Sequence, residues 1–407
     1  MKKQLLVILY PYKFSKFLWN SMELDYITKN FDVEVWDLSL VLNRKFAKSI
    51  YSDGEVGDEV IRFNDVIQLT KYLINFRKKN SKKRIYYINE IPLATFKNMI
   101  CYTLVLGSVS GNQILEYLNP GVPPNYLNVS NNPLGAKKTI YSKAIDVIFK
   151  STGFKEFLQI VNSWIATKFG NVIAKSGTHK LIAGHEWLRE SESFNLRKNI
   201  KVILGHTNDI SNCIIYSQAG ANSKNSGIVH LDAAGPLFGT DSIILKRKTF
   251  LTSENWYPKL SNFFSYLEVF FAENVTIAGH YKSNFSSPSP VFQGRDVIYM
   301  NTISLVANAK LVTTRFSSSI SIAVFFNKPI YFIYSNELLL DKESMRHIIG
   351  LSTLLKSPSI NIDNIQSVEL NSFKVDNLAY SDFITKYLSS GPRELANYEI
   401  ILKNFLV

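Results

Sequence analysis

The sequence has few cysteines and no long hydrophobic run. Its 407 residues include two cysteines, Cys101 and Cys213, far apart and outside any CxxC pair, so we expect neither a disulfide framework nor a zinc site. No stretch approaches the roughly 20 apolar residues of a membrane helix. The short apolar run after Met1 ends at Tyr10-Pro11 without a small-residue cleavage site, which predicts a buried strand rather than a signal peptide.

Several enzyme motifs are also absent. The chain has no GxGxxG, GxxxxGK[ST], GxSxG or HExxH, which counts against dinucleotide oxidoreductases, P-loop enzymes, serine hydrolases and zincins. It has no Asp-x-Asp pair either, the pair with which many transferases hold a divalent metal on a diphosphate. We therefore predict no metal site, no cofactor and a metal-independent mechanism.

The residues that are present predict a large core and a basic surface. With 46% hydrophobic and 13% aromatic residues the chain can bury a full core, and its length favours two domains. The net charge of +13 indicates an anionic partner or a generally basic surface. The densest basic run, Lys78 to Arg84, is expected at the C-terminus of a helix, where cations interact favourably with the helix dipole. The alternative is that this run contacts a lipid surface. Basic residues are otherwise scattered, so no nucleic-acid partner is expected.

Strands alternate with helices in both halves of the chain. In the first half, strands are expected at 4–10, 31–37, 84–88 and 180–184, and helices near 15–29, 65–79, 92–105 and 137–170. In the second half, strands are expected at 200–205, 227–231, 242–246, 274–278, 297–299, 311–313 and 329–334, and helices near 209–219, 256–272, 301–308 and 318–326. This alternation predicts parallel sheets with crossover helices, an α/β fold with two Rossmann-like lobes.

The polar stretch 188–199 is the predicted linker between the lobes, and 119–136 is a Pro/Asn/Gly-rich loop of a length that is often functional. We accordingly divide the chain into an N-terminal lobe at 1–192, a C-terminal lobe at 193–388 and a closing helix at 389–407. That helix has apolar positions at helical spacing. An end on an apolar helix without a polar tail is typical of a fragment of a longer protein.

The stretch 301–335 is the first candidate for chemistry. It predicts a helix, the strand LVTT, the polar turn RFSSS, a second helix and the strand IYFIY after Lys328-Pro329. Ser317, Ser318 and Ser319 would open the second helix, where free N–H groups, hydroxyls and the helix dipole bind a phosphate, and Arg315 could add a charged fork. The alternative is an ordinary serine cap.

The stretch GIVHLDAAG at 227–235 is the second candidate. It predicts an apolar strand that delivers Asp232 to its carboxyl end, followed by small residues that leave open space. Ligands of open α/β sheets gather at the carboxyl ends of strands. The alternative for Asp232 is an Asx turn or a helix cap. His230, two residues earlier, is expected to be a core or supporting residue.

Three predicted strands end in Gly-His and bring imidazoles to the same sheet edges. These are His185, followed by Glu186, after KLIAG; His206 after KVILG; and His280, followed by Lys282, after VTIAG. Imidazole, carboxylate and ammonium groups at these positions are candidates for acid-base catalysis and anion binding. For each histidine the alternative is a structural role.

Together the two stretches and the two-lobed plan resemble the retaining β-Kdo glycosyltransferases that terminate lipopolysaccharide O-antigen chains, the WbbB-like family. The resemblance implies a GT-B-type arrangement of two Rossmann-like lobes whose C-terminal helix crosses back to the first lobe, acceptor on the first lobe and donor on the second. It implies transfer of Kdo from CMP-Kdo with retention, through a covalent adduct on Asp232 as nucleophile. The catalytic candidates are then Asp232, Glu186, His185 and His206, and the donor-binding candidates are His280, Lys282, Arg315, Ser317, Ser318 and Ser319.

The resemblance also implies the partners: a CMP-activated sugar and a lipid-linked O-antigen glycan, met in the cytoplasm with peripheral contact to the inner membrane. Retention needs two inversions, which a carboxylate nucleophile supplies, and CMP leaves as a stable monophosphate. Two alternatives stay open. One is a CMP-sialic-acid, UDP-sugar or GDP-sugar transferase of the same fold, and the other is a non-catalytic basic binding protein.

Overall fold

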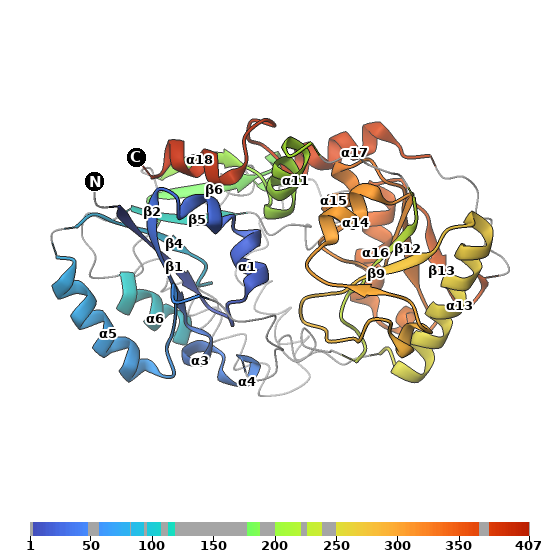
Figure 1. Cartoon of the computed structure of the whole chain (residues 1–407), viewed down its shortest axis with the longest axis horizontal. Coiled ribbons are helices and arrows are strands. Elements are labelled where there is room, and N and C mark those ends of the chain that lie inside the picture. Colours follow the sequence, from blue (N-terminus) through green and yellow to red (C-terminus); the bar gives the residue numbers. More distant parts are fainter. Residues whose placement is uncertain are drawn as a thin grey trace, which may run out of the picture.

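The protein consists of two α/β lobes, which lie side by side in the computed structural model (Figure 1). The structure describes residues 3–47, 57–81, 83–92, 96–106, 113–118, 177–187, 200–220, 226–237, 250–365 and 374–406. Each lobe is built on a parallel sheet, as the alternation of strands and helices predicts.

The first lobe contains a seven-stranded parallel sheet in the order β3-β2-β1-β4-β5-β6-β7. Its strands are β1 (Gln4–Tyr10), β2 (Phe31–Asp37), β3 (Val60–Arg62), β4 (Ile85–Asn89), β5 (Gln113–Leu118), β6 (His179–Ala183) and β7 (Lys201–Gly205). The central strands β1 and β4 are almost wholly buried, because helices of crossover connections cover a parallel sheet on both faces.

The helices of the first lobe are α1 (Lys16–Ser21), α2 (Leu24–Ile27), α3 (Ser39–Leu42), α4 (Arg44–Ala47), α5 (Val66–Lys79) and α6 (Phe96–Leu106). Two apolar clusters form on the two faces of the sheet. One contains α1, α2 and the C-terminal segment, and the other contains α3, α5 and α6. Helix α1 lies on the side of the lobe that faces the second lobe (Figure 1).

The second lobe contains a six-stranded parallel sheet in the order β10-β9-β8-β11-β12-β13. Its strands are β8 (Ile228–Leu231), β9 (Val275–Ala278), β10 (Val297–Ile298), β11 (Leu311–Thr314), β12 (Ile330–Tyr334) and β13 (Ser359–Asn361). Its helices are α11 (Asn208–Gln218), α13 (Ser253–Phe271), α14 (Thr302–Asn308), α15 (Ile320–Phe325), α16 (Lys342–Leu354) and α17 (Asn377–Phe383).

The last helix, α18 (Asn397–Asn404), returns to the first lobe. Ile400, Ile401 and Phe405 join the first lobe's core, and the Tyr398 ring stacks on Tyr26 of α2 with centroids 4.6 Å apart. This crossing-back helix and the two Rossmann-like sheets confirm the GT-B-type arrangement expected from the sequence.

The boundary between the lobes differs from the predicted one. Strand β7 pairs in parallel with β6, so residues 201–205 belong to the first sheet, whereas α11 contributes Ile210 and Ile214 to the core of the second lobe. This moves the boundary predicted between 192 and 193 to the turn between β7 and α11. The predicted linker 188–199, the loop 119–136, the helix near 137–170 and the strand 242–246 lie outside the described residues.

Candidate functional site

Asp232 lies directly after β8, at the carboxyl end of a central strand of the second sheet. Its backbone N–H donates to the carbonyl oxygen of Ala278 at 3.1 Å, which joins the end of β8 to the end of β9. The sequence predicted this strand and this position. Since the carboxyl ends of neighbouring parallel strands share one edge, Asp232 sits among the side chains that follow β9 and β11.

The Asp232 carboxyl group is buried, and burial raises its pKa to about 6. Hydrogen bonds from the backbone N–H groups of His280 and Ala234, the charge of Arg315 and a hydrogen bond from Ser283 oppose this rise. The bond to Ala234 is an Asx turn, as the alternative interpretation expected. Among the described residues, however, Oδ2 is buried and has no hydrogen-bond partner, so one carboxylate oxygen is unsatisfied.

Arg315 follows β11 and brings its guanidinium to the Asp232 segment. A Cβ atom built on Gly235 would lie 3.0 Å from Arg315 Nη2, so the guanidinium packs directly against this glycine. The Arg315 Cζ atom lies 4.8 Å from the Phe316 ring centroid and 5.9 Å from that of Trp256. The absence of a side chain at Gly235 therefore gives a cation its place beside the buried carboxylate.

His280 and Lys282 lie in the turn after β9 and are brought to the same edge. The backbone N–H of Lys282 donates to His280 Nδ1 at 3.1 Å, and the Lys282 ammonium lies 5.4 Å from the Tyr281 ring centroid. The contact of His280 with Asp232 is made by its backbone N–H rather than its imidazole. Both side chains are partly exposed and accessible to a ligand.

Ser317, Ser318 and Ser319 form the turn between β11 and α15, as predicted. The N–H of Ser319 donates to Ser317 Oγ at 3.3 Å, whereas the N-cap position, Ser319, makes no side-chain capping bond. The serine turn thus begins two residues after Arg315. Its role in binding a phosphate stays a prediction.

His230 is a core residue. Its Nδ1 lies 3.0 Å from the Thr313 hydroxyl, its ring packs against Phe264, and burial lowers its pKa to about 3. A neutral imidazole enclosed in this way supports the β8–β11 pair, as expected from the sequence.

His206 is fully buried where the chain returns to the first lobe. Its Nε2 lies 3.1 Å and 3.0 Å from the carbonyl oxygens of Pro392 and Leu395, and its Nδ1 lies 2.8 Å from Ser389 Oγ. Since carbonyl oxygens only accept, Nε2 carries the proton and Nδ1 accepts from the Ser389 hydroxyl. Both ring nitrogens are therefore engaged in hydrogen bonds within the protein. A catalytic role for His206 stays a prediction.

His185 and Glu186 open a short helical turn after β6, at the carboxyl end of that strand. His185 is exposed and Glu186 is partly exposed. The adjoining Gly184 has a positive φ, and its N–H donates to Ser390 Oγ at 3.2 Å, which fixes the turn against the returning chain. A catalytic role for this pair stays a prediction.

Sequence reasoning missed one carboxylate at the edge of the first sheet. Glu90 follows the buried strand β4 directly, and its N–H donates to the carbonyl oxygen of Leu9 at 3.0 Å. The signal was the same as for Asp232: an apolar strand, IYYIN, that ends in a carboxylate. Burial raises the pKa of Glu90 to about 7.

The described residues contain no group of three or more His, Cys, Asp or Glu side chains that could hold a metal ion. Within the same ranges, no helix combines the length and the hydropathy needed to cross a membrane.

The sequence matches no protein-family model, and no curated protein sequence matches it. Solved structures do resemble it. The wall teichoic acid polymerase TagF is 11% identical over 98% of this chain and 88% of its own, with a TM-score of 0.47. MnaA of S. aureus, solved with UDP, is 12% identical over 99% and 96%, with a TM-score of 0.47. The UDP-GlcNAc 2-epimerase of Methanocaldococcus jannaschii, solved with UDP-GlcNAc and UDP, is 10% identical over 98% and 99%, with a TM-score of 0.42.

Proposed function

We propose that the chain is a glycosyltransferase that moves Kdo from CMP-Kdo to an O-antigen glycan with retention, by double displacement through Asp232. The observation that carries this proposal is a buried carboxylate at a strand end, with one oxygen free of hydrogen bonds and an arginine beside it. Most buried side-chain polar atoms have at least one hydrogen-bond partner. A buried, partly unsatisfied carboxylate is the expected state of a nucleophile whose partner is a substrate.

The proposed reaction has two displacements. The ionised Asp232 attacks the anomeric carbon, the bond from that carbon to the phosphate oxygen breaks, and the electron pair leaves with CMP. In the second displacement an acceptor hydroxyl attacks the same carbon, and the carboxylate leaves. Two inversions give net retention.

The same edge of the sheet offers the cations that an anionic donor requires. CMP-Kdo carries a phosphate and a carboxylate, and Arg315, Lys282 and His280 follow neighbouring strands around Asp232. We propose that Arg315 holds the phosphate together with the serine turn at 317–319, and that Lys282 and His280 meet the sugar carboxylate. A guanidinium already positioned for the leaving phosphate can stabilise its charge without a metal.

The experiment uses the intact chain with CMP-Kdo and no acceptor. The wild-type protein is expected to gain the mass of one Kdo residue, on the peptide that contains Asp232, and to release one equivalent of CMP in a burst. The Asp232→Ala variant is expected to gain no mass, and its transfer rate should fall by roughly 10⁴-fold or more. A wild-type chain that turns over without an adduct, or a product of inverted configuration, would contradict the double displacement.

The alternative donors use the same apparatus. A UDP-sugar, a GDP-sugar or CMP-sialic acid would meet the same edge, and an adduct of a different sugar mass in the same experiment would identify it. A non-catalytic binding protein would gain no sugar mass and release no CMP in that experiment.

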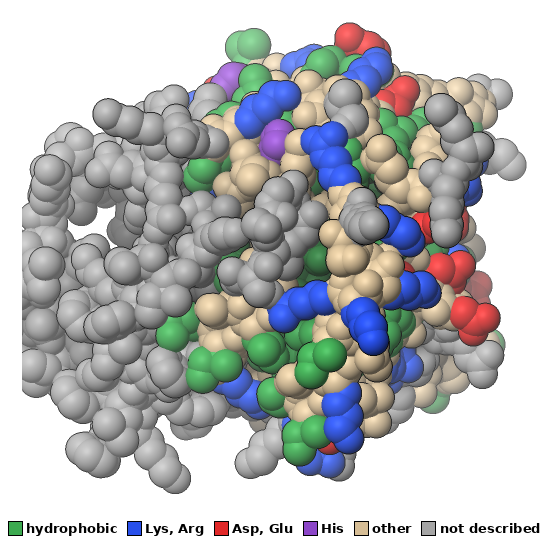
Figure 2. All heavy atoms as spheres, turned by 90° about the vertical axis from the view of Figure 1, so that its left-hand side faces the viewer, with side chains coloured by type: hydrophobic (Ala, Val, Ile, Leu, Met, Phe, Trp, Pro, Cys, Tyr) green, Lys and Arg blue, Asp and Glu red, His purple; other side chains and the backbone are tan. Residues whose placement is uncertain are grey.

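We propose further that helix α5 rests on an anionic membrane, where a lipid-linked acceptor is found. Ile67 and Ile74 are 68% and 61% exposed, and helical spacing puts the exposed Lys71 and Lys78 on the same face. Figure 2 shows Lys and Arg side chains among hydrophobic ones on this side of the lobe. Exposed apolar residues beside lysines are typical of helices that bind anionic lipid surfaces.

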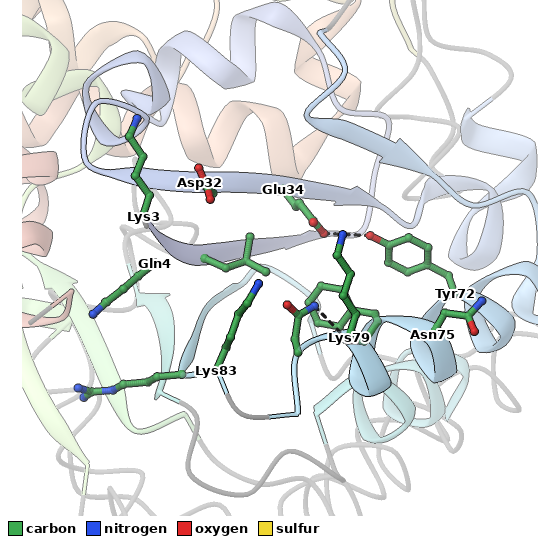
Figure 3. Close-up of a pocket in the computed structure, with 12 residues that line it drawn as sticks. Lys3, Gln4, Asp32, Glu34, Tyr72, Asn75, Lys79 and Lys83 are labelled. Atoms are coloured by element: carbon green, nitrogen blue, oxygen red, sulfur yellow. Dashed lines mark hydrogen bonds between the residues drawn. The ribbon is translucent and has the colours of Figure 1, made fainter. Parts of the chain in front are cut away.

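A pocket of about 670 Å³ adjoins this helix at the amino-terminal ends of β1 and β4. Lys3, Lys79 and Lys83 line this pocket together with Tyr72 and Glu34, and the Tyr72 hydroxyl donates a hydrogen bond of 3.0 Å to Glu34 (Figure 3). Lys3 and Lys83 extend the cationic surface beyond α5.

Vesicle flotation tests the membrane contact. The wild-type chain is expected to float with phosphatidylglycerol vesicles and not with phosphatidylcholine vesicles, and the Ile67→Glu/Ile74→Glu variant should stay in solution. Val269→Glu is the matched control, because Val269 is 84% exposed on α13 of the other lobe. Equal flotation of the double variant and the wild type would contradict the proposal.

A further inference from the structure

Asp37 and Glu90, two acidic side chains at the carboxyl edge of the first sheet, are in different environments. Asp37, the last residue of β2, accepts hydrogen bonds from the N–H groups of Phe14 and Ser39 at 3.1 Å and 3.0 Å and from Arg62 Nε at 3.1 Å. That side chain is fully used in holding the loop before α1. Glu90, after β4, has no such set of donors: among the described residues, burial is the cause that acts on its carboxyl group.

Glu90 is partly exposed as a residue, although protein surrounds its carboxyl group. It lies near the Tyr10 and Tyr117 hydroxyls, the ends of β1 and β5, since its charge raises the pKa of both. A carboxylate that lies near two tyrosines and, among the described residues, is not consumed by structural hydrogen bonds differs from an ordinary buried acid.

The turn after β9 of the second lobe links the neighbourhood of Glu90 to Asp232. Tyr281 stacks on Phe17 of α1 with ring centroids 4.6 Å apart and an interplanar angle of 7°, and it also acts electrostatically on Tyr10. The residue before Tyr281 is His280, whose N–H hydrogen-bonds the Asp232 carboxylate. The turn after β9 thus contacts Asp232 through the His280 N–H and helix α1 of the first lobe through the Tyr281 ring.

We propose that Glu90 is the general base of the second displacement, taking the proton of the acceptor hydroxyl. This inference rests on the proposed function, and it gives the first lobe a catalytic residue of its own. The acceptor oxygen attacks the anomeric carbon, the bond from that carbon to Asp232 breaks, and its electron pair returns to the Asp232 carboxylate. The hydroxyl proton moves to the Glu90 carboxylate and passes from there to water.

The ionisation of Glu90 suits this role. Its pKa of about 7 lies near neutral pH, where a base is both largely available and strong enough to take a proton in the transition state. Asp232 has the lower of the two raised values, about 6, as a nucleophile that must be ionised first requires. The two carboxylates would thereby have separate roles, Asp232 as the nucleophile of the first step and Glu90 as the base of the second.

The experiment isolates the second step by letting water act as the acceptor. Wild-type and Glu90→Gln chains are loaded with CMP-Kdo, desalted, and followed by intact-protein mass spectrometry. Both should form the adduct at similar rates, whereas the adduct of Glu90→Gln should persist roughly 10²-fold longer or more. Added formate, a small carboxylate, should shorten that lifetime in the variant and not in the wild type.

Glu23→Gln is the matched control. Glu23 is buried on the same lobe and its pKa is likewise raised to about 7, but its Oε2 accepts the N–H of Tyr398 at 2.8 Å and so holds α18. Its adduct should decay as in the wild type. Equal decay of the Glu90→Gln adduct, or failure of that variant to form it, overturns the inference, whereas a wild-type chain without an adduct overturns the proposed function itself.

Discussion

The guanidinium of Arg315 occupies the space that a side chain at residue 235 would take: a Cβ on Gly235 would lie 3.0 Å from Nη2 and 3.2 Å from Nη1. The Tyr257 hydroxyl donates to the Gly235 carbonyl oxygen at 2.8 Å and so fixes this glycine from the other side. Gly235, in the segment after Asp232, and Arg315, the residue after β11, therefore pack against each other. The small residues of the DAAG motif position a cation next to the carboxylate.

Asp232→Asn is expected to stabilise the fold while it abolishes transfer. Burial raises the pKa of Asp232 from 3.8 to about 6, so between these values the folded state binds more protons than the unfolded state. Wild-type stability therefore falls as pH rises from about 4 to about 6. The amide avoids this cost, which gives the variant a gain of up to about 3 kcal/mol above pH 6 and almost none below pH 4.

Urea unfolding of both proteins at pH 4 and pH 8 measures this gain. Asp37→Asn is the control, since it weakens the acceptor of Arg62 and of two backbone N–H groups and should lose stability at pH 8. A gain that does not change with pH would show that the Asp232 carboxyl group is not strained by burial.

Arg315→Ala is expected to weaken CMP binding by roughly 10- to 100-fold, because a charge-assisted hydrogen bond to a phosphate is worth about 1.5–3 kcal/mol. Isothermal titration calorimetry with CMP measures the change. Arg346→Ala, which removes an exposed arginine of α16, should leave the affinity unaltered. If both variants bind like the wild type, the phosphate is held elsewhere.

His206→Ala is expected to destabilise the protein without stopping the chemistry. The change removes hydrogen bonds to Ser389, Pro392 and Leu395 and leaves a cavity, a combined loss of about 2–4 kcal/mol. Adduct formation per folded molecule should remain within a few-fold of the wild type. Loss of the adduct in a protein that still melts cooperatively would instead favour His206 as a catalytic base.

The sequence was informative wherever local pattern decides structure. Strands β1, β2, β8 and β9 were predicted nearly to the residue, since β1, β8 and β9 are largely apolar runs and β2 alternates apolar with acidic residues. Asp232 was found in this way, and Glu90 carries the same pattern. Glu90 was overlooked because nothing in the residues after it differs from an ordinary loop.

Long-range pairing explains the remaining differences. The tripeptides of β3 and β13 are too short to have a period, and only pairing with β2 and β12 makes them strands. The run KVILG reads as the start of a second lobe, yet β7 pairs with β6 and closes the first sheet. His206 and His280 both follow a strand that ends in glycine, so the sequence did not distinguish them. The returning segment 389–397, nearly 200 residues later, encloses His206.

The shifts in melting temperature that CMP, UDP and GDP cause in the presence of EDTA identify the donor nucleotide. A ligand at 100 times its Kd stabilises the native state by about 2.7 kcal/mol, a shift of a few degrees for a chain of this size. We expect CMP to give this shift without a divalent metal, since Arg315 supplies the charge that a metal would otherwise bring to the phosphate. UDP and GDP, which are diphosphates rather than the monophosphate that the proposed reaction releases, should shift the melting temperature less. A shift by CMP that requires magnesium or manganese would contradict the metal-independent mechanism, and a larger shift by UDP would favour a UDP-sugar as the donor.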